Sequence, residues 1–486
     1  MDGTTDSRER HLDRLGPGVL ALLRRYVETS RRGGVPVVRT PPLAELEAVL
    51  HLPRGEAPGP VDDAQVLDFL RRYLDHSTRM HHPAFLAHQV AVPDEASALA
   101  DLIHGVSNNG MAIYEMGPAA VAVEFAVLDW MLALAGWPRL RRPEDQGCPG
   151  PFAGGVLTNG GSLANLTALL AARAHAAPDT WEQGATGDLC VLAPPEAHYS
   201  IGRAVGIMGL GTGALVPVTA DSRQVIRPDR LPAAARAARA GGRRIMALVA
   251  SACSTGPGLY DPLEEIAAFC HEEGIWLHVD GAHGASALLS PTLRSHLRGI
   301  DKADSLVWDA HKMLRTSALC AAVLVRDGAR LEAAFRQEAS YILHDSDRPG
   351  VDLITRTVEC TKLPLGLKLY LNLLISGEDS LRSYVERQYA VTRRFHDIIA
   401  ARPGFSCPFP PEANILCFRA PGDDETQLDL RRRLLEKGDF YLSSTEIAGT
   451  RYLRLTVMGP ETGDAQIEGL LAAIEALGAG REAPSS

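Results

Sequence analysis

The sequence has 486 residues, which is enough for two or three domains of roughly 100 to 200 residues each. Hydrophobic residues make up 46% and charged residues 22% of it, and no uninterrupted apolar run reaches the length of a membrane span. The formal net charge is −10, whereas a protein that binds nucleic acid needs a clustered excess of Lys and Arg. The composition therefore indicates a globular protein with neither a nucleic-acid nor a membrane partner.

The N-terminus and the cysteines bear on where the protein works. The first ten residues are polar, and no apolar segment of a secretory signal follows them, so we expect a cytoplasmic protein. Eight cysteines are scattered along the chain without a CxxC pair, and no histidine cluster has zinc-ligand spacing. We therefore expect most cysteines to be small buried side chains in a reducing cytoplasm, and we expect no metal site.

Two stretches near the N-terminus, residues 15–26 and 66–73, have amphipathic helical patterns and are separated by proline-rich links. Helices this short bury little surface by themselves. We expect residues 1–95 to form a helical arm that packs on another subunit or on the main domain. An ordinary N-terminal extension is the alternative.

An irregular segment with three histidines, residues 81–89, follows the amphipathic stretches. The pair His82-Pro83 forces an extended backbone, which suits no common helix of metal ligands. We therefore expect this segment to be a loop that lines a substrate site. Farther on, the apolar stretch at 121–137 predicts a long buried helix.

A glycine-rich turn, residues 154–165, runs straight into the helix-forming residues 166–173. Small residues at a strand-to-helix turn leave backbone N–H groups free, and the helix N-terminus adds partial positive charge, so the turn suits a phosphate. The spacings GxxxxGK[ST] and GxGxxG are absent, which excludes a Walker loop and the dinucleotide fingerprint. A glycine-rich turn that caps a helix without any ligand is the alternative.

Strand and helix patterns alternate through the middle of the chain, which predicts an α/β fold with a largely parallel sheet. We assign residues 96–375 to this large domain and residues 376–486 to a small C-terminal α+β domain. The predicted strands of the large domain are 188–193, 243–251, 275–280, 305–309 and 320–325.

Polar residues follow several of these strands. Asp280 ends one strand, and Lys312 comes just after the next, so both should lie at the carboxyl edge of the sheet, where such sheets bind ligands. Pyridoxal phosphate chemistry needs this pair, because a lysine forms the Schiff base and an acid keeps the pyridine nitrogen protonated. An ordinary salt bridge is the alternative. His198 and Thr255 follow two other strands and fall on the same rim, although His198 would also suit a surface position before a helix.

The ordered motifs resemble those of the pyridoxal-phosphate amino-acid decarboxylases that act on glutamate, cysteine sulfinate or aromatic amino acids. The likeness runs from about His82 into the C-terminal domain. It implies the fold-type I architecture, with a mainly parallel seven-stranded sheet in the large domain, and a homodimer whose active site lies at the subunit interface. The segments that carry it are Gly160-Gly161-Ser162, Ala197-His198-Tyr199-Ser200, 261–280 and 303–313.

The resemblance also implies roles for single residues. Lys312, Asp280 and His198 would be catalytic: Lys312 forms the Schiff base, Asp280 pairs with the pyridine nitrogen, and His198 stacks on the ring. The other residues expected to touch the cofactor are Gly161 and Ser162 at the phosphate with His311 close by, Ala282 on the second face of the ring, and Thr255 near the ring substituents.

The sequence departs from the family pattern in a mobile loop. Family members usually present a tyrosine there, which protonates the substrate carbon after decarboxylation, yet no tyrosine lies between Ile342 and Lys362. His344 or a water would then supply the proton, or the reaction would end differently. Gly281 and His283 stand where an alanine and an aromatic residue are common, and Ala84 stands where a basic residue is common.

We expect an enzyme that decarboxylates an L-amino acid with a polar or acidic side chain to the amine and CO2. The candidate substrate residues are His88, in the loop before residue 90, Arg454, near the end of the chain, and His344. The alternative keeps the cofactor and forms an aldehyde, a transamination product or a carbon-carbon bond. A catalytically inactive family member with a binding role is a third hypothesis, and the presence of Lys312, Asp280 and His198 together argues against it.

Overall fold

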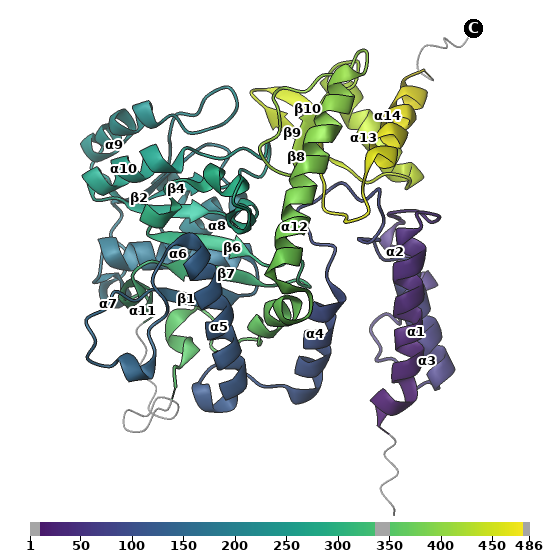
Figure 1. Cartoon of the computed structure of the whole chain (residues 1–486), viewed down its shortest axis with the longest axis horizontal. Helices are drawn as coiled ribbons and strands as arrows, with labels where there is room; N and C mark the ends of the chain where they lie inside the picture. Colours follow the sequence, from purple (N-terminus) through teal and green to yellow (C-terminus); the bar gives the residue numbers. More distant parts are fainter. Residues whose placement is uncertain (1–9, 336–349, 480–486) are drawn as a thin grey trace, which may run out of the picture.

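The computed structural model describes residues 10–335 and 350–479. Figure 1 shows a large α/β part, a smaller part built from the C-terminal residues, and a helical arm beside the smaller part. The arm contacts the C-terminal part through the Arg31–Glu461 ion pair and through the Val37 N–H, which donates to the Gly438 carbonyl. The helices of the arm are α1 (His11–Arg31), α2 (Leu43–Val49) and α3 (Asp63–Asp75), of which α2 was not predicted.

The large part is organised around a seven-stranded sheet in the order β1-β7-β6-β5-β4-β2-β3. Neighbouring strands from β3 to β6 pair in parallel, whereas β7 is antiparallel to both β1 and β6. This topology confirms the predicted α/β fold with a mainly parallel sheet. The strands are β1 (Gly154–Thr158), β2 (Leu189–Ala193), β3 (Leu215–Pro217), β4 (Arg244–Ser251), β5 (Trp276–Asp280), β6 (Ser305–Asp309) and β7 (Ala321–Val325).

Helices cover both faces of the sheet, and each face has its own hydrophobic core. Strands buried on both faces are mainly apolar on both sides, which is why their sequences lack a regular polar-apolar alternation. One core packs α6 (Gly161–Ala176), α8 (Tyr199–Ile207) and α11 (Gly328–Glu332) on the sheet, and the other packs α5 (Pro118–Ala135), α9 (Leu231–Ala240) and α10 (Leu263–Glu273). The remaining helices of this part are α4 (Glu95–Ser107) and α7 (Thr180–Gln183).

Within the described ranges, α5 is the helix whose 18 residues are long and apolar enough to span a membrane, with a mean hydropathy of 1.7. It nevertheless carries Glu124, which is fully buried and pairs with the equally buried Lys362. Phe125, Leu128 and Leu132 of α5 belong to the core beneath the sheet. Its hydrophobicity is therefore explained by its place in the protein interior.

The C-terminal part packs α13 (Asp424–Lys437) and α14 (Asp464–Ala479) on an antiparallel sheet of β8 (Ile415–Phe418), β10 (Thr450–Thr456) and β9 (Ser443–Ile447). The edge strand β9 was not predicted, because most of its side chains are polar and only half-buried. The long helix α12 (Gly366–Ala401) joins the two parts and crosses the predicted boundary at 375/376. Its helical geometry breaks at Gly377, where φ is +79°.

Candidate active site

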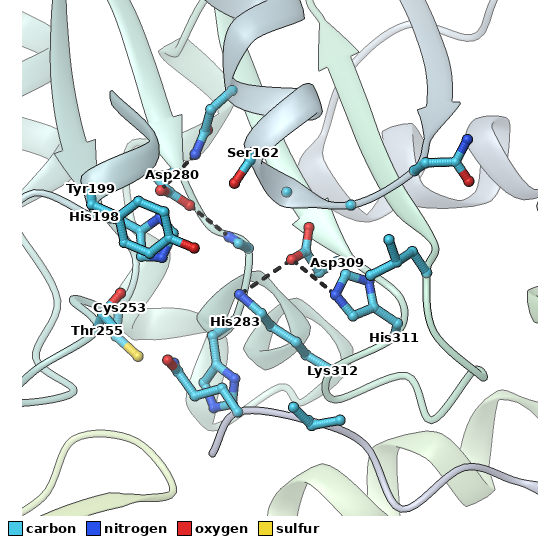
Figure 2. Close-up of a pocket in the computed structure, with 18 residues that line it drawn as sticks. Ser162, His198, Tyr199, Cys253, Thr255, Asp280, His283, Asp309, His311 and Lys312 are labelled. Carbon is cyan, nitrogen blue, oxygen red and sulfur yellow. Dashed lines mark hydrogen bonds and ion pairs between the residues drawn. The ribbon is translucent and has the colours of Figure 1, made fainter. Parts of the chain in front are cut away.

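A cavity of about 300 Å³ opens at the carboxyl edge of the large sheet. Its walls come from the ends of β4, β5 and β6 and from the first turns of α6 and α8, as Figure 2 shows. The predicted site residues that line it are Gly161, Ser162, His198, Thr255, Asp280, Ala282, His311 and Lys312. Residues separated by up to 151 positions in the sequence therefore meet at one site, as expected for this edge of an α/β sheet.

One end of the cavity is formed by the glycine-rich turn before α6. Gly160 has a φ of +99°, a conformation that favours glycine, and α6 begins at Gly161. A Cβ atom on Gly161 would lie only 2.8 Å from an oxygen of Asp309, so this position has no room for a side chain. Ser162 and His311 line the same end, and His311 Nδ1 lies 2.7 Å from the carbonyl oxygen and 3.2 Å from the backbone nitrogen of Cys320. Free backbone N–H groups, a hydroxyl and an imidazole suit a phosphate.

Lys312 lies in the middle of the cavity with its ammonium 3.2 Å from Asp309 Oδ2 (Figure 2). The Asp309 side chain is only 2% exposed, and its other oxygen has no hydrogen-bond partner among the described residues. The alternative of a salt bridge between Asp280 and Lys312 is therefore wrong, because Lys312 pairs with a different carboxylate.

Asp280 ends β5 at another wall of the cavity (Figure 2). Its Oδ1 accepts the Ala282 N–H at 3.2 Å, and its Oδ2 accepts an N–H of the Asn165 side chain at 3.0 Å. These two donors hold the carboxylate in one orientation and stabilise its charge. The carboxylate is thus free of any lysine and suited to a positively charged ring nitrogen.

His198 is the N-cap residue of α8, and its ring lies beside that of Tyr199, with 4.2 Å between the ring centroids. Its Nδ1 lies 2.7 Å from Ser200 Oγ. Burial lowers the pKa of His198, although the nearby Asp280 opposes this shift, so the ring is neutral at physiological pH. A half-buried ring in the cavity wall disagrees with the alternative of a surface histidine.

The three candidate substrate residues differ in position. His88 is exposed, does not line the cavity, and meets the Tyr441 hydroxyl at 2.8 Å, whereas its neighbours Gln89 and Val90 line the cavity. The segment thus contributes Gln89 and Val90 to the cavity wall, whereas His88 is not one of the lining residues. Arg454 is buried behind the wall, and its guanidinium donates to the Thr255 carbonyl at 2.7 Å. His344 lies outside the described residues.

Comparisons with known proteins support what this geometry indicates. A family profile described as the pyridoxal-dependent decarboxylase conserved domain matches residues 59–421, three quarters of the chain. The chain belongs to this family. It is 31% identical to mouse cysteine sulfinic acid decarboxylase over 436 residues, which cover 85% of this chain and 86% of the relative. It is 29% identical to the human acidic amino acid decarboxylase GADL1 over 458 residues, which cover 90% and 85% of the two chains.

Solved structures agree with the assignment to the pyridoxal-dependent decarboxylases. The crystal structure of mouse CSAD superimposes with a TM-score of 0.87 at 27% identity and covers 96% of this chain and 99% of that one. The Oryza sativa TDC structure with PLP and tryptamine gives the same TM-score at 23% identity, covering 98% and 99% of the two chains, and so supports the fold. The protein is therefore a pyridoxal-phosphate-dependent carboxy-lyase, as predicted.

The residues of this decarboxylase fit pyridoxal phosphate. The turn at Gly161 suits the phosphate, the Asp280 carboxylate suits the ring nitrogen, and the Lys312 amine lies in the same cavity for the aldehyde. When bound, the cofactor supplies an electron sink for the pair of electrons left on the substrate carbon as CO2 departs. The chain itself supplies the charges, the hydrogen bonds and the walls.

Several lining residues of the decarboxylase were not predicted. Asp309 is the first residue of the Asp-Ala-His-Lys segment that contains Lys312, and its position at the end of a strand could have identified it as a site residue. Asn165 was not assigned a role because one turn of helix separates it from the glycines. Cys253 and His283 also line the cavity: burial raises the pKa of the Cys253 thiol to about 12, and burial, followed by the charge of Lys312, lowers the pKa of His283 to about 3. Both groups are therefore neutral.

Proposed function

We propose that this enzyme decarboxylates an L-amino acid with a polar or acidic side chain to the corresponding amine and CO2. Among the relatives, one is named for acidic amino acids and another for cysteine sulfinic acid, which carries a sulfinate group. An L-2,4-diaminobutyrate decarboxylase of Acinetobacter baumannii is also similar, at 26% identity over 83% of this chain and 81% of the relative. The choice between an anionic and a cationic substrate is therefore argued from the charges at the cavity.

The observation that carries the proposal is Arg454, a buried cation that has no anionic partner among the residues that the structure describes. Its guanidinium donates to the backbone carbonyls of Ala87, Thr255 and Gly256 and to the Ser443 hydroxyl. Within residues 10–335 and 350–479, no carboxylate forms an ion pair with it. Burial lowers the pKa of Arg454, because removal of the guanidinium from water disfavours its charged form. A buried cation of this kind favours the arrival of an anion.

The field of Arg454 reaches the cavity. Lys312 and Arg454 both contribute to the low pKa of His283, a residue of the cavity wall, in addition to burial. The carbonyl that Arg454 contacts belongs to Thr255, another wall residue. Although the carboxylates of Asp280 and Asp309 also line the cavity, Arg454 lies directly behind Thr255, and in this proposal its charge would favour a carboxylate or sulfinate side chain over an ammonium group.

In this proposal, each residue that lines the cavity has a separate role. Lys312 would bind the cofactor, and Asp280 would keep its ring nitrogen charged. His198 and Ala282 would contact the two faces of the ring, and Thr255 would lie near the ring substituents. Gly161, Ser162 and His311 would hold the phosphate. The bond from the substrate carbon to its carboxylate breaks, and a proton must then reach that carbon. His344 or a water is proposed as its source, because residues 343–361 contain no tyrosine.

The same sequence feature favours a second candidate function. Without a tyrosine in that loop, the enzyme would form an aldehyde with dioxygen as the oxidant, a transamination product or a carbon-carbon bond on the same cofactor. The products separate the two functions: an amine and one CO2 support simple decarboxylation, whereas ammonia, peroxide or a larger amino acid supports the second candidate.

We also propose that the enzyme is a homodimer with its active site at the subunit interface. Helices α4 and α12 are neighbours (Figure 1). Apolar side chains of these two helices are exposed, namely Leu99, Leu102, Ile103, Val106, Tyr370, Leu374 and Ile375. A short segment connects this surface to the cavity. The Ser317 N–H donates to Ser97 Oγ of α4 at 2.9 Å. Leu319, two residues later in the chain, lines the cavity and is 46% exposed. A second copy on this surface would bury the patch and close the cavity.

The test of the dimer is the mass of the holoenzyme in solution. Sedimentation should give a dimer for the wild type and a monomer of low activity for Leu102→Glu. A fully active wild-type monomer would contradict the proposal. A cytoplasmic location is a further proposal, and it is supported by the cysteines, all eight of which are free.

The test of the reaction is a substrate panel with mass detection of products. Holoenzyme is offered L-glutamate, L-aspartate, L-cysteine sulfinate, L-2,4-diaminobutyrate and L-tyrosine. We expect turnover of an anionic substrate, with a KM that rises in Arg454→Met and less in Arg454→Lys, which keeps the charge. Arg451→Met is the matched control, because Arg451 lies on the same strand but pairs with Glu446 at the surface. Turnover confined to L-2,4-diaminobutyrate or L-tyrosine would reject the anionic preference.

A further inference from the structure

Behind the cavity wall, a chain of buried side chains connects the interior of the sheet to both Asp280 and His198. Trp276 Nε1 lies 2.8 Å from Ser305 Oγ, which lies 2.8 Å from His278 Nδ1, and His278 Nε2 lies 2.9 Å from Asn165 Oδ1. The Asn165 amide nitrogen then reaches Asp280 Oδ2 at 3.0 Å and Ser200 Oγ at 2.9 Å. Except for the terminal groups Asp280 and His198, every member is at most 3% exposed.

The two ends of this chain determine the direction of every hydrogen bond in it. The Trp276 indole can only donate, and the Asp280 carboxylate can only accept. The Asn165 atom that faces Asp280 must therefore be its nitrogen, which leaves its oxygen to accept a hydrogen bond from His278 Nε2–H. Burial lowers the pKa of His278 to about 4, so the ring is neutral and its Nδ1 accepts the Ser305 hydroxyl proton.

The second branch determines which nitrogen of His198 carries the proton. One N–H of Asn165 donates to Ser200 Oγ, and the Ser200 hydroxyl is then free to donate to His198 Nδ1 at 2.7 Å. The Ser200 backbone N–H also points at this nitrogen, at 3.4 Å. Because Nδ1 accepts in both contacts, the neutral ring carries its proton on Nε2.

We propose that Asn165 is a positioning residue that sets the orientation of Asp280 and the tautomer of His198 together. Its carboxamide has three hydrogen-bonding directions in use, two as donor and one as acceptor, and His278 holds it in the orientation that serves both partners. The hydrogen bonds of Asn165 thereby keep the Asp280 carboxylate oriented for the cofactor ring and keep the proton of His198 on Nε2, in one arrangement of the side chains. This proposal rests on the proposed roles of Asp280 and His198.

Two sets of variants test the two branches separately. Asn165→Leu removes the donor to Asp280, so we expect the dissociation constant for pyridoxal phosphate, measured by titration of the apoenzyme, to rise roughly ten- to hundredfold. Thr167→Val is the matched control on the same helix, because Thr167 is fully buried and its hydroxyl donates only to the Leu163 carbonyl. It should leave cofactor affinity unchanged.

Ser200→Ala removes the hydroxyl donor to His198 and leaves Asp280 with its Asn165 contact. We expect kcat to fall roughly two- to tenfold with little change in KM or cofactor affinity, and Ser200→Thr, which keeps the hydroxyl, to restore it. The acid limb of the pH profile should also move to higher pH, because loss of a donor to the neutral ring raises the pKa of His198. The charged groups that act on this ring are Asp280, Lys312, Asp309 and Arg203, and all of them are retained in the variant.

The outcomes distinguish this proposal from the proposed function. If Asp280→Ala and His198→Ala leave turnover intact, the proposed function fails. If those two variants abolish turnover while Asn165→Leu binds the cofactor like Thr167→Val, the positioning role of Asn165 is overturned. Should Asn165→Leu not fold, the serine pair decides: equal kcat values and pH profiles for Ser200→Ala and Ser200→Thr overturn the proposal, and a loss in alanine alone supports it.

Discussion

Gly161 lies close to Asp309 at the end of the cavity that we expect to bind the cofactor phosphate. The variant Gly161→Ala therefore tests this end of the cavity. The new Cβ would lie 2.8 Å from Asp309 Oδ2 and 3.1 Å from Oδ1, so the carboxylate that pairs with Lys312 must move. Overpacking of this kind costs about 1–3 kcal/mol. Since about 1.4 kcal/mol corresponds to a factor of ten, we expect pyridoxal phosphate to bind roughly five- to hundredfold more weakly.

The assay is titration of the apoenzyme with pyridoxal phosphate, followed by the absorbance of the bound cofactor, together with the melting temperature of the apoenzyme. Gly206→Ala is the control, because this glycine lies in α8 and a Cβ there would meet no atom within 4 Å. We expect the control to bind the cofactor normally and to be equally or slightly more stable, since alanine favours a helix. Normal cofactor affinity in Gly161→Ala would refute the reasoning about the turn.

Four further outcomes are expected. Lys312→Ala should lose the absorption band of covalently bound cofactor, because Lys312 is the lysine that lines the cavity within the described residues. Asp280→Ala should still bind the cofactor weakly but lose several orders of magnitude in kcat, because the electron sink is lost. In urea titrations, Lys362→Met should lower the free energy of unfolding by about 3–5 kcal/mol, because Glu124 is fully buried and would lose its cation. The free energy of unfolding should fall as the pH drops from 6.5 toward about 3, because His283 binds a proton in the unfolded chain but stays neutral in the folded protein. The variant His283→Gln should reduce this slope by up to about 1.4 kcal/mol per pH unit.

Each of these expectations has a control or a result that would contradict it. Lys302→Met is the control for the buried pair, because Lys302 meets Glu264 at 3.9 Å on the surface and should contribute less than about 1 kcal/mol. A cofactor band that survives in Lys312→Ala would mean that another amine binds the aldehyde. Wild-type turnover in Asp280→Ala, or an unchanged slope of stability with pH in His283→Gln, would contradict the corresponding argument.

The layered fold was predictable from the sequence because its signal is local. Buried strands such as 244–251 and 276–280 are mainly apolar, and strand and helix patterns alternate along the large part of the chain. The edge strand β9 lacked this signal, since a half-exposed strand needs no apolar side chains. The helix α2 was missed for a similar reason: it is seven residues long and has no buried side chain.

The loop before Val90 shows where a local pattern stops being informative. His88 and Gln89 are adjacent, yet Gln89 lines the cavity and His88 is exposed beside Tyr441. In a helix or strand, the periodicity would have indicated which side chain points inward. An irregular loop has no such period, so the direction of each side chain depends on the elements against which the loop packs.

The sequence by itself determined the α/β class and the association of Lys312, Asp280 and His198 with one rim, because residues that directly follow parallel strands must meet at the carboxyl edge of the sheet. Only the tertiary structure decided which charges pair there. It placed Asp309 rather than Asp280 beside Lys312, brought Asn165 against Asp280, and buried Arg454 with no carboxylate partner in the described part of the chain. Such partnerships depend on distances of a few ångströms between distant segments, and these distances are set when helices and strands pack together.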